Sequence, residues 1–160
     1  MLVVSNTSPI LNLAIIGRLD LLRRQFGEIL IPQAVFEELR TEEDLPGSQA
    51  MRKAAREEWV RVQTVISQPL VQVLRRELDK GEAEAIALAS ELQAERILLD
   101  EREGRRVAKS LRMKVTGLLG VGLRARYDGE ISSVSEMIEE LRVKAGFRID
   151  AKLVADVLKE

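Results

Sequence analysis

The sequence predicts a single α/β domain in which a central parallel β-sheet is covered by helices on both faces. Short apolar runs alternate with longer segments of helical periodicity along the whole chain. Such alternation is typical of parallel sheets, because parallel strands need helical crossover connections. The 160 residues are enough for one domain, and we find no internal repeat, low-complexity stretch or linker that would divide them.

The strands that we expect are short and mostly apolar. They lie at Leu2–Val4, Ile29–Pro32, Trp59–Val65, Arg96–Leu99 and Lys114–Thr116. Pro32 ends the second strand, because proline has no N–H group to donate to a neighbouring strand. Trp59–Val65 alternates apolar and polar residues, as a half-exposed strand does.

Helices are expected between and after these strands. They cover Pro9–Ile15, Leu19–Phe26, Gln33–Arg40, Ala50–Glu58, Pro69–Asp79, Glu82–Gln93, Glu101–Arg112, Leu118–Tyr127, Val134–Lys144 and Asp150–Lys159. Ser8 is the expected N-cap of the first helix, with Pro9 at its first helical position. We divide the chain into an α/β domain at residues 1–146 and a C-terminal helical extension at residues 147–160 that packs on it.

The composition excludes several kinds of site. The chain has no cysteine and no histidine, so carboxylates are its only strong candidates for acid–base chemistry or metal binding. The net charge is −1, and most of the 25 cationic residues are arginine, which suits phosphate binding or surface ion pairs. Arginine takes part in surface ion pairs more often than in phosphate binding. No stretch approaches the roughly 20 apolar residues of a membrane span, so we expect a cytoplasmic protein without membrane contact.

Four polar residues are candidates for one site. Asn6 and Asp100 directly follow predicted strands, and the carboxyl ends of parallel strands form the edge where α/β proteins place their sites. With about 100° between successive helical residues, Glu38 falls at the border of an apolar face. The same rotation places Glu82 in an apolar stripe and turns Glu84 outward. A carboxylate in an apolar stripe is costly unless a partner such as a divalent cation neutralises it.

Each of these residues also has a simpler explanation. Glu82 lies in the first turn of its helix, where the helix dipole favours a negative charge. Asp100 and Glu103 fit a D-x-x-E variant of the capping box. Asn6 fits an ordinary turn residue at a strand end. Taken singly, acidic residues in such positions are more often caps or solvated charges than metal ligands.

The order of five motifs along the chain favours a shared functional site. The motifs are Ser5-Asn6-Thr7-Ser8-Pro9, Ile31-Pro32-Gln33-Ala34-Val35-Phe36-Glu37-Glu38-Leu39, Gly81-Glu82-Ala83-Glu84-Ala85-Ile86-Ala87-Leu88-Ala89, Leu98-Leu99-Asp100-Glu101-Arg102-Glu103-Gly104-Arg105-Arg106 and Thr116-Gly117-Leu118-Leu119-Gly120. In this order the chain resembles the PIN-domain superfamily, and within it a prokaryotic, DUF3368-like branch with S-N/D-T-S-P and G-E-x-E-A-I motifs. The resemblance extends from Val4 to Ile149.

The resemblance implies a three-layer α/β/α fold and an acidic pocket that holds Mg²⁺ or Mn²⁺. It implies endoribonuclease activity on RNA, and for many members a toxin role with a small antitoxin protein as partner. Its four acidic positions fall on Asn6, Glu38, Glu82 and Asp100. Glu103 is a candidate for a fifth, outer ligand. The sequence is compatible with a homodimer.

Further positions follow from the same resemblance. Thr7 or Ser8 matches the small hydroxyl residue beside the first ligand, whereas Leu98 replaces the threonine usual before the fourth carboxylate. Because an acidic pocket repels RNA, cations at its rim must hold the phosphates. The candidates for this role are Arg102, Arg105, Arg106 and Lys109. An ordinary exposed helix face would show the same residues.

Asn6 leaves two hypotheses of different classes. Its side-chain oxygen can still bind a metal ion, but the residue supplies no negative charge. The chain is therefore either a metal-dependent endoribonuclease or an inactive PIN-like module that binds RNA or a protein. A phosphoacceptor signalling domain would need a pair of acids after the first strand, which Val4-Ser5-Asn6 lacks.

Overall fold

A computed structural model describes residues 1–158 and contains a five-stranded, fully parallel sheet. Its strands are β1 (Val3–Ser5), β2 (Ile29–Ile31), β3 (Val60–Val62), β4 (Arg96–Leu98) and β5 (Val115–Thr116), in the order β3-β2-β1-β4-β5. Val4 is in register with Leu30 on one side and with Ile97 on the other. The strand order changes direction between β1 and β4, which is where α/β sheets open a crevice at their carboxyl edge.

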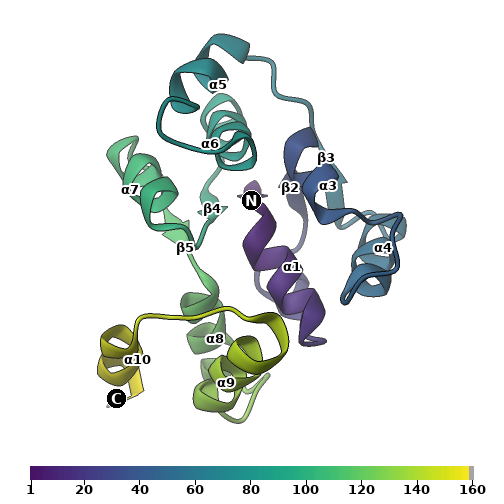
Figure 1. Cartoon of the computed structure of the whole chain (residues 1–160), viewed down its shortest axis with the longest axis vertical. Helices are drawn as coiled ribbons and strands as arrows, with labels where there is room; N and C mark the ends of the chain where they lie inside the picture. Colours follow the sequence, from purple (N-terminus) through teal and green to yellow (C-terminus); the bar gives the residue numbers. More distant parts are fainter. Residues whose placement is uncertain (159–160) are drawn as a thin grey trace.

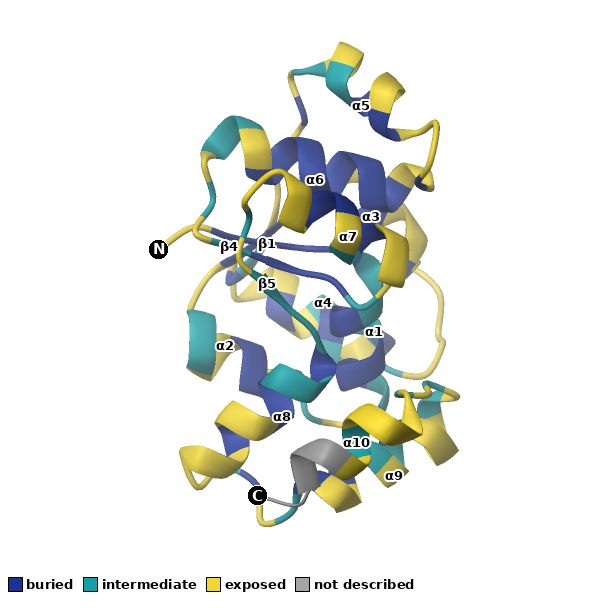
Figure 2. Ribbon diagram, turned by 90° about the vertical axis from the view of Figure 1, so that its left-hand side faces the viewer, coloured by how far each residue is buried: buried dark blue, intermediate teal, exposed yellow. Residues whose placement is uncertain are grey.

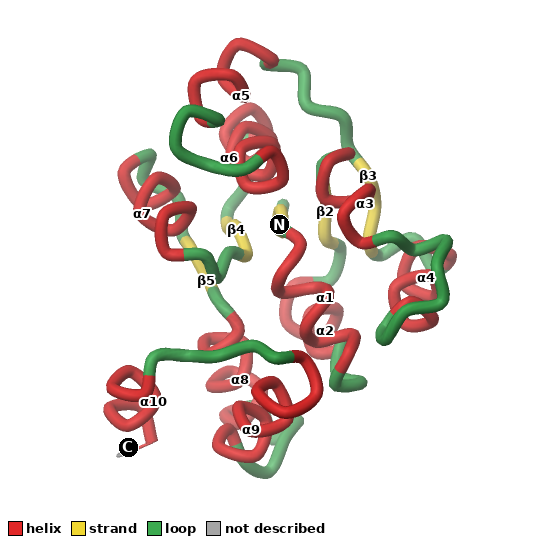
Figure 3. The backbone as a smooth tube through the Cα atoms, in the orientation of Figure 1, coloured by secondary structure: helices red, strands yellow, loops and turns green. Residues whose placement is uncertain are grey.

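The helices connect the strands and follow the last one (Figure 3). They are α1 (Thr7–Ile15), α2 (Asp20–Phe26), α3 (Gln33–Leu39), α4 (Ser48–Arg56), α5 (Gln68–Leu74), α6 (Lys80–Leu92), α7 (Arg102–Ser110), α8 (Leu118–Tyr127), α9 (Val134–Ala145) and α10 (Ala151–Leu158). All five strands and all ten helices expected from the sequence are present, with boundaries that differ by a few residues.

The sheet lies between two helical layers because alternate strand residues point to opposite faces. Val3 and Leu98 belong to a core shared with α1, α2, α8 and α9, whereas Val4, Ile97 and Leu99 belong to a core shared with α5, α6 and α7. Figure 2 shows the buried central strands between these layers. The three-layer α/β/α fold expected from the sequence is therefore confirmed.

Two helix starts differ from the sequence-based expectation. Asn6, not Ser8, is the N-cap of α1, and its backbone is extended. Pro9 is consequently the third helical residue, still within the first turn, where its missing N–H group is tolerated. Helix α6 begins at Lys80, earlier than expected, because Asp79 caps it: the Glu82 backbone N–H donates to Asp79 Oδ1 at 2.8 Å.

The C-terminal extension crosses the lower helical layer. Residues 147–150 have no regular secondary structure and connect α9 to α10 (Figure 1). Phe147 packs against the core that contains α1 and α9, and its backbone N–H donates to the Leu141 carbonyl at 3.0 Å. Residues 159 and 160 of the predicted extension lie outside the described residues. Within residues 1–158, each helix is too short or too polar to cross a membrane.

Candidate metal and nucleic-acid site

Two neighbouring pockets open at the carboxyl edge of the sheet. The acidic pocket has a volume of about 360 Å³, and its polar lining consists of Asn6, Thr7, Ser8, Asn12, Glu38, Asp79 and Glu101. The basic pocket has a volume of about 790 Å³, and its charged lining consists of Asp100, Arg102, Arg105, Arg106, Lys109, Arg148 and Asp150. Phe147 lines both pockets, so they share a wall.

Asn6 is held at the end of β1 and offers one free oxygen. Its backbone N–H donates to the Leu98 carbonyl at 3.0 Å, which fixes the residue beside β4. The residue is 4% exposed. Among the described residues, none gives a hydrogen bond to its buried Oδ1. A buried amide oxygen without a donor is unusual, and it is a suitable ligand for a hard cation.

Glu38 reaches the acidic pocket from α3. Thr7 Oγ1 donates to Glu38 Oε2 at 2.7 Å, so one hydroxyl of the Asn-Thr-Ser turn orients this carboxylate. The carboxylate lies over Gly81, where a Cβ atom would collide with it. The glycine of the Gly81-Glu82 motif is thus explained by space: it lets Glu38 approach the start of α6.

Glu82 is a buried carboxylate with a raised pKa. It is 7% exposed, and its pKa is raised from 4.5 to about 7 by burial, by contact with the Asp79 side chain and by the nearby charge of Glu101. Its Oε2 atom is buried without a hydrogen-bond partner in the described part of the chain. A Cβ atom at Gly104 would lie 2.6 Å from Oε2, so α7 also needs a glycine at its contact with this carboxylate.

Asp100 is anchored to α8. The Leu118 backbone N–H donates to Asp100 Oδ1 at 2.8 Å, and a Cβ atom at Gly117 would lie 2.7 Å from the same oxygen. Burial raises its pKa to about 6, although the Leu118 hydrogen bond and the Arg105 charge lower it. Its Oδ2 atom has no hydrogen-bond partner within residues 1–158. The capping-box explanation is wrong, because Glu101 is the N-cap of α7 and no side chain caps it.

The predicted outward orientation of Glu84 is wrong. Glu84 is 8% exposed, and its Oε1 accepts a hydrogen bond from the Ala34 backbone N–H at 3.1 Å. Glu84 thus accepts a backbone N–H group in the first turn of α3, where such groups have no carbonyl partner within the helix. Every residue from Gly81 to Ala89 is buried, because α3, α5 and α7 cover the sides of α6 that do not face the sheet. Helical periodicity cannot define an outward face on such a helix.

Glu103 has a different environment from the other acidic candidates. It is exposed and lines neither pocket. Its Oε2 accepts hydrogen bonds from Arg106 Nε at 3.2 Å and Nη2 at 3.1 Å. The structure thus gives Glu103 an ion pair on the surface of α7 and does not bring it to Asn6, Glu38 and Asp79 in the acidic pocket.

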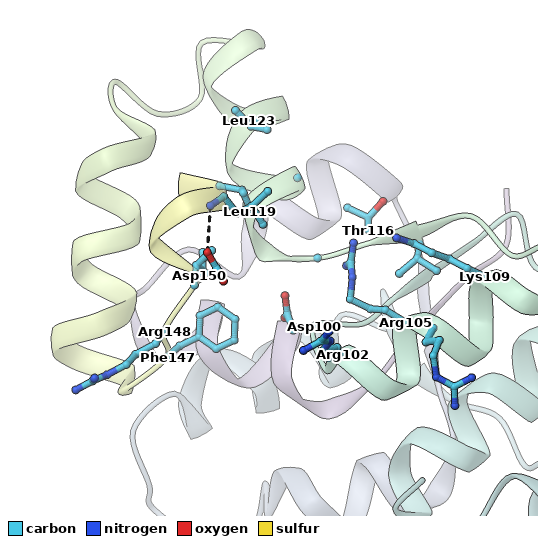
Figure 4. A pocket seen from close by; sticks show the side chains of 16 residues that line it. Asp100, Arg102, Arg105, Lys109, Thr116, Leu119, Leu123, Phe147, Arg148 and Asp150 are labelled. Atoms are coloured by element: carbon cyan, nitrogen blue, oxygen red, sulfur yellow. Dashed lines mark hydrogen bonds between the residues drawn. The ribbon is translucent and has the colours of Figure 1, made fainter. Parts of the chain in front are cut away.

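The four predicted phosphate-binding cations share one wall of the basic pocket. Arg102, Arg105, Arg106 and Lys109 project from α7. Arg105 Nη1 donates to the Leu99 carbonyl at 2.8 Å, which ties this guanidinium to the strand end beside Asp100. Figure 4 shows Arg105 and Lys109 on one side of Asp100 and Phe147 on the other.

Sequence reasoning missed several residues of these pockets. Asp79 and Glu101 line the acidic pocket and Arg148 lines the basic one. Asp79 had a usable signal, since an aspartate three residues before a glutamate at a helix start is typical of an N-cap. The proximity of Arg148 depends on how residues 147–150 cross the fold, which no local pattern encodes.

The donor set fits a divalent cation, although the acidic side chains do not converge on one point. Among residues 1–158, no three acidic side chains are grouped closely enough to hold a metal ion by themselves. In the same part of the chain, however, Asn6 Oδ1, Glu82 Oε2 and Asp100 Oδ2 are buried oxygens without hydrogen-bond partners. Hard cations such as Mg²⁺ and Mn²⁺ bind oxygen ligands of this kind, and Mg²⁺ keeps several waters.

Comparisons with known proteins identify the family and support the fold. Residues 2–160 match a family model described as "DUF3368: PIN domain". Among solved structures, the chain is similar to a PilT N-terminus domain protein from the hyperthermophilic archaeon Sulfolobus solfataricus P2. The TM-score is 0.52 at 17% sequence identity, and the match covers 88% of this chain and 93% of the archaeal chain, so it supports the fold alone. No curated protein matches.

Proposed function

The chain belongs to the PIN-domain family, whose members are generally nucleases, and on this premise we propose that it is a metal-dependent endoribonuclease. The observation that carries the proposal is that Asn6, Glu82 and Asp100 each have a buried side-chain oxygen without a hydrogen-bond partner among residues 1–158. Burial of a carboxylate or amide oxygen without a hydrogen-bond donor costs free energy, and a bound cation would offset this cost.

Glu38, Glu82, Asp100 and the amide oxygen of Asn6 would hold Mg²⁺ or Mn²⁺. Bound there, the cation would supply an activated water and offset the charge that develops on a phosphodiester during hydrolysis. Thr7 orients Glu38 through its 2.7 Å hydrogen bond, and the Leu118 N–H group orients Asp100.

The basic pocket supports a nucleic-acid substrate. Its arginines and Lys109 lie next to Asp100, so a phosphate backbone bound to them would run past the acidic edge. Arg106 is already paired with Glu77 at 2.8 Å and with Glu103, whereas Arg105 donates to the Leu99 carbonyl and lies beside Asp100, at the junction of the basic pocket and the acidic edge. We therefore assign Arg105 the closest phosphate contact. The proposal extends to a toxin role, in which a small antitoxin protein would inhibit by covering the acidic pocket.

The decisive test is RNA cleavage with Mn²⁺ and with Mg²⁺. We expect cleavage by the wild type and its loss in Glu82→Gln and Asp100→Asn. Glu84→Gln is the matched control, because it lies on the same helix and keeps an acceptor oxygen for the Ala34 N–H group. Wild-type cleavage rates in both Glu82→Gln and Asp100→Asn would refute the assignment.

Asn6 favours one alternative, a PIN-like module that binds RNA or a protein without cleaving. The residue lacks the charge that an aspartate would supply at the end of β1. In this case Asn6→Asp should create Mn²⁺-dependent cleavage that the wild type lacks. Strong wild-type cleavage would exclude the alternative.

A further inference from the structure

We propose that Asp79 supplies to the acidic pocket the negative charge that Asn6 lacks, and so acts as the fourth carboxylate of the cation site. The inference rests on the proposed metal-dependent function and concerns which residues of this chain hold the cation. The negative charge that is missing at Asn6 would then come from Asp79, at the start of α6.

Asp79 lies at the acidic pocket, directly before α6. Asp79 lines the same pocket as Asn6, Glu38 and Glu101. It immediately precedes α6, and its Oδ1 accepts the Glu82 backbone N–H at 2.8 Å. The hydrogen bond holds Asp79 beside Glu82, so it adds a carboxylate next to two of the predicted acidic positions, Glu38 and Glu82.

Two buried oxygens belong to neighbours of Asp79: Asn6 lines the same pocket, and the Glu82 backbone N–H donates to Asp79 Oδ1. Asn6 Oδ1 and Glu82 Oε2 belong to side chains that are 4% and 7% exposed, and in the described part of the chain neither oxygen has a hydrogen-bond partner. A cation held in part by Asp79 would give such oxygens a partner that the described residues do not supply.

The negative charges around Asp79 also favour a bound cation. Asp79 is held beside Glu82 by the 2.8 Å hydrogen bond to the Glu82 backbone N–H, and it lines the acidic pocket together with Glu38 and Glu101. Like charges at contact distance repel strongly unless a proton or a cation lies between them. A divalent cation bound here would offset the repulsion between the two carboxylates.

Helix capping alone does not require an aspartate at this position. A cap needs one side-chain oxygen, and asparagine and serine provide it as well as aspartate does. Asp79→Asn therefore separates the two roles: it keeps the cap of α6 and removes the charge. Glu77→Gln is the matched control, because it removes a charge from the same loop at a residue that lines neither pocket.

The experiment is Mn²⁺ titration by calorimetry without RNA, combined with thermal unfolding followed by circular dichroism. We expect Asp79→Asn to weaken Mn²⁺ binding at least about tenfold, as loss of a ligand or of its supporting group does, with little change in unfolding temperature. Adding Asn6→Asp to Asp79→Asn should restore most of the affinity. Glu77→Gln should bind Mn²⁺ as the wild type does.

The outcomes are distinct. Wild-type Mn²⁺ affinity in Asp79→Asn, with binding lost in Glu82→Gln, would overturn the role of Asp79 and leave the proposed function standing. Weakened binding that Asn6→Asp does not restore would also overturn it, because Asp79 would then act only on local structure. Asp79-dependent Mn²⁺ binding without RNA cleavage would support the inference and refute the nuclease proposal. Absence of Mn²⁺ binding by the wild type would overturn both.

Discussion

Replacement of Glu82 by glutamine should stabilise the protein at neutral and alkaline pH while it abolishes the proposed activity. Folding raises the pKa of Glu82 from 4.5 to about 7, so the folded state binds a proton more tightly than the unfolded chain does. The stability that protonated Glu82 contributes is fully present below about pH 4.5 and is lost as the pH rises through about pH 7. Glutamine cannot ionise and escapes this loss.

The structure sets the size of the effect. Because a pKa change of one unit corresponds to about 1.4 kcal/mol, the raised pKa of Glu82 sets an upper limit of about 3 kcal/mol. Besides burial, part of the rise in the Glu82 pKa comes from the neighbouring charges of Asp79 and Glu101, which solvent screening weakens. We therefore expect Glu82→Gln to exceed the wild type by about 2 kcal/mol in unfolding free energy at about pH 8, and to equal it at about pH 4.

Urea unfolding at a series of pH values, with a chelator present to remove metal ions, measures this difference. Glu91→Gln is the control for loss of a glutamate from the same helix, and it should keep the wild-type pH dependence because it leaves the surroundings of Glu82 intact. Addition of Mn²⁺ should raise the stability of the wild type and leave that of Glu82→Gln nearly unchanged. Parallel pH profiles for the wild type and Glu82→Gln would refute the reasoning.

Two further predictions concern residues without a direct chemical role. Gly104→Ala would place a methyl group 2.6 Å from Glu82 Oε2, so this carboxylate must move. We expect the Mn²⁺ affinity measured by calorimetry to fall about tenfold. An unchanged affinity would show that Glu82 is not a ligand in this position. Glu84→Ala leaves the Ala34 N–H group buried without its acceptor and should cost about 2 kcal/mol in urea unfolding. The folded fraction of Glu84→Ala should still cleave RNA, and a loss of cleavage there would mean that Glu84 belongs to the site.

The sequence was sufficient for the fold because its signals are local. Apolar runs set the strands and turn residues set their ends, and all of these elements form. The order of the strands places Asn6 next to Leu98, and the rule for carboxyl edges applies to this order. The prediction that Glu82 faces inward is correct. A residue in the apolar stripe of α6 packs against a neighbouring element, whichever helix that is.

The remainder of the site depends on packing that local patterns do not encode. Glu84 is buried because α3 crosses α6, a tertiary contact that overrides the periodicity of a helix covered on all sides. Asp100 bonds to Leu118, which is 18 residues later in the chain, in place of its own helix. Arg148 reaches the basic pocket only because residues 147–150 cross beside α8.

The glycines that lie against the acidic side chains are a second way in which a relative of this chain could lose the proposed activity. Gly81, Gly104 and Gly117 come from three different segments, and each leaves room for a carboxylate that another segment contributes. Addition of a single carbon atom at any of them would disturb the site while every acidic group remained in the sequence. A related chain that retains all its acidic residues can therefore be inactive, and a reading of the acidic positions alone would not detect it.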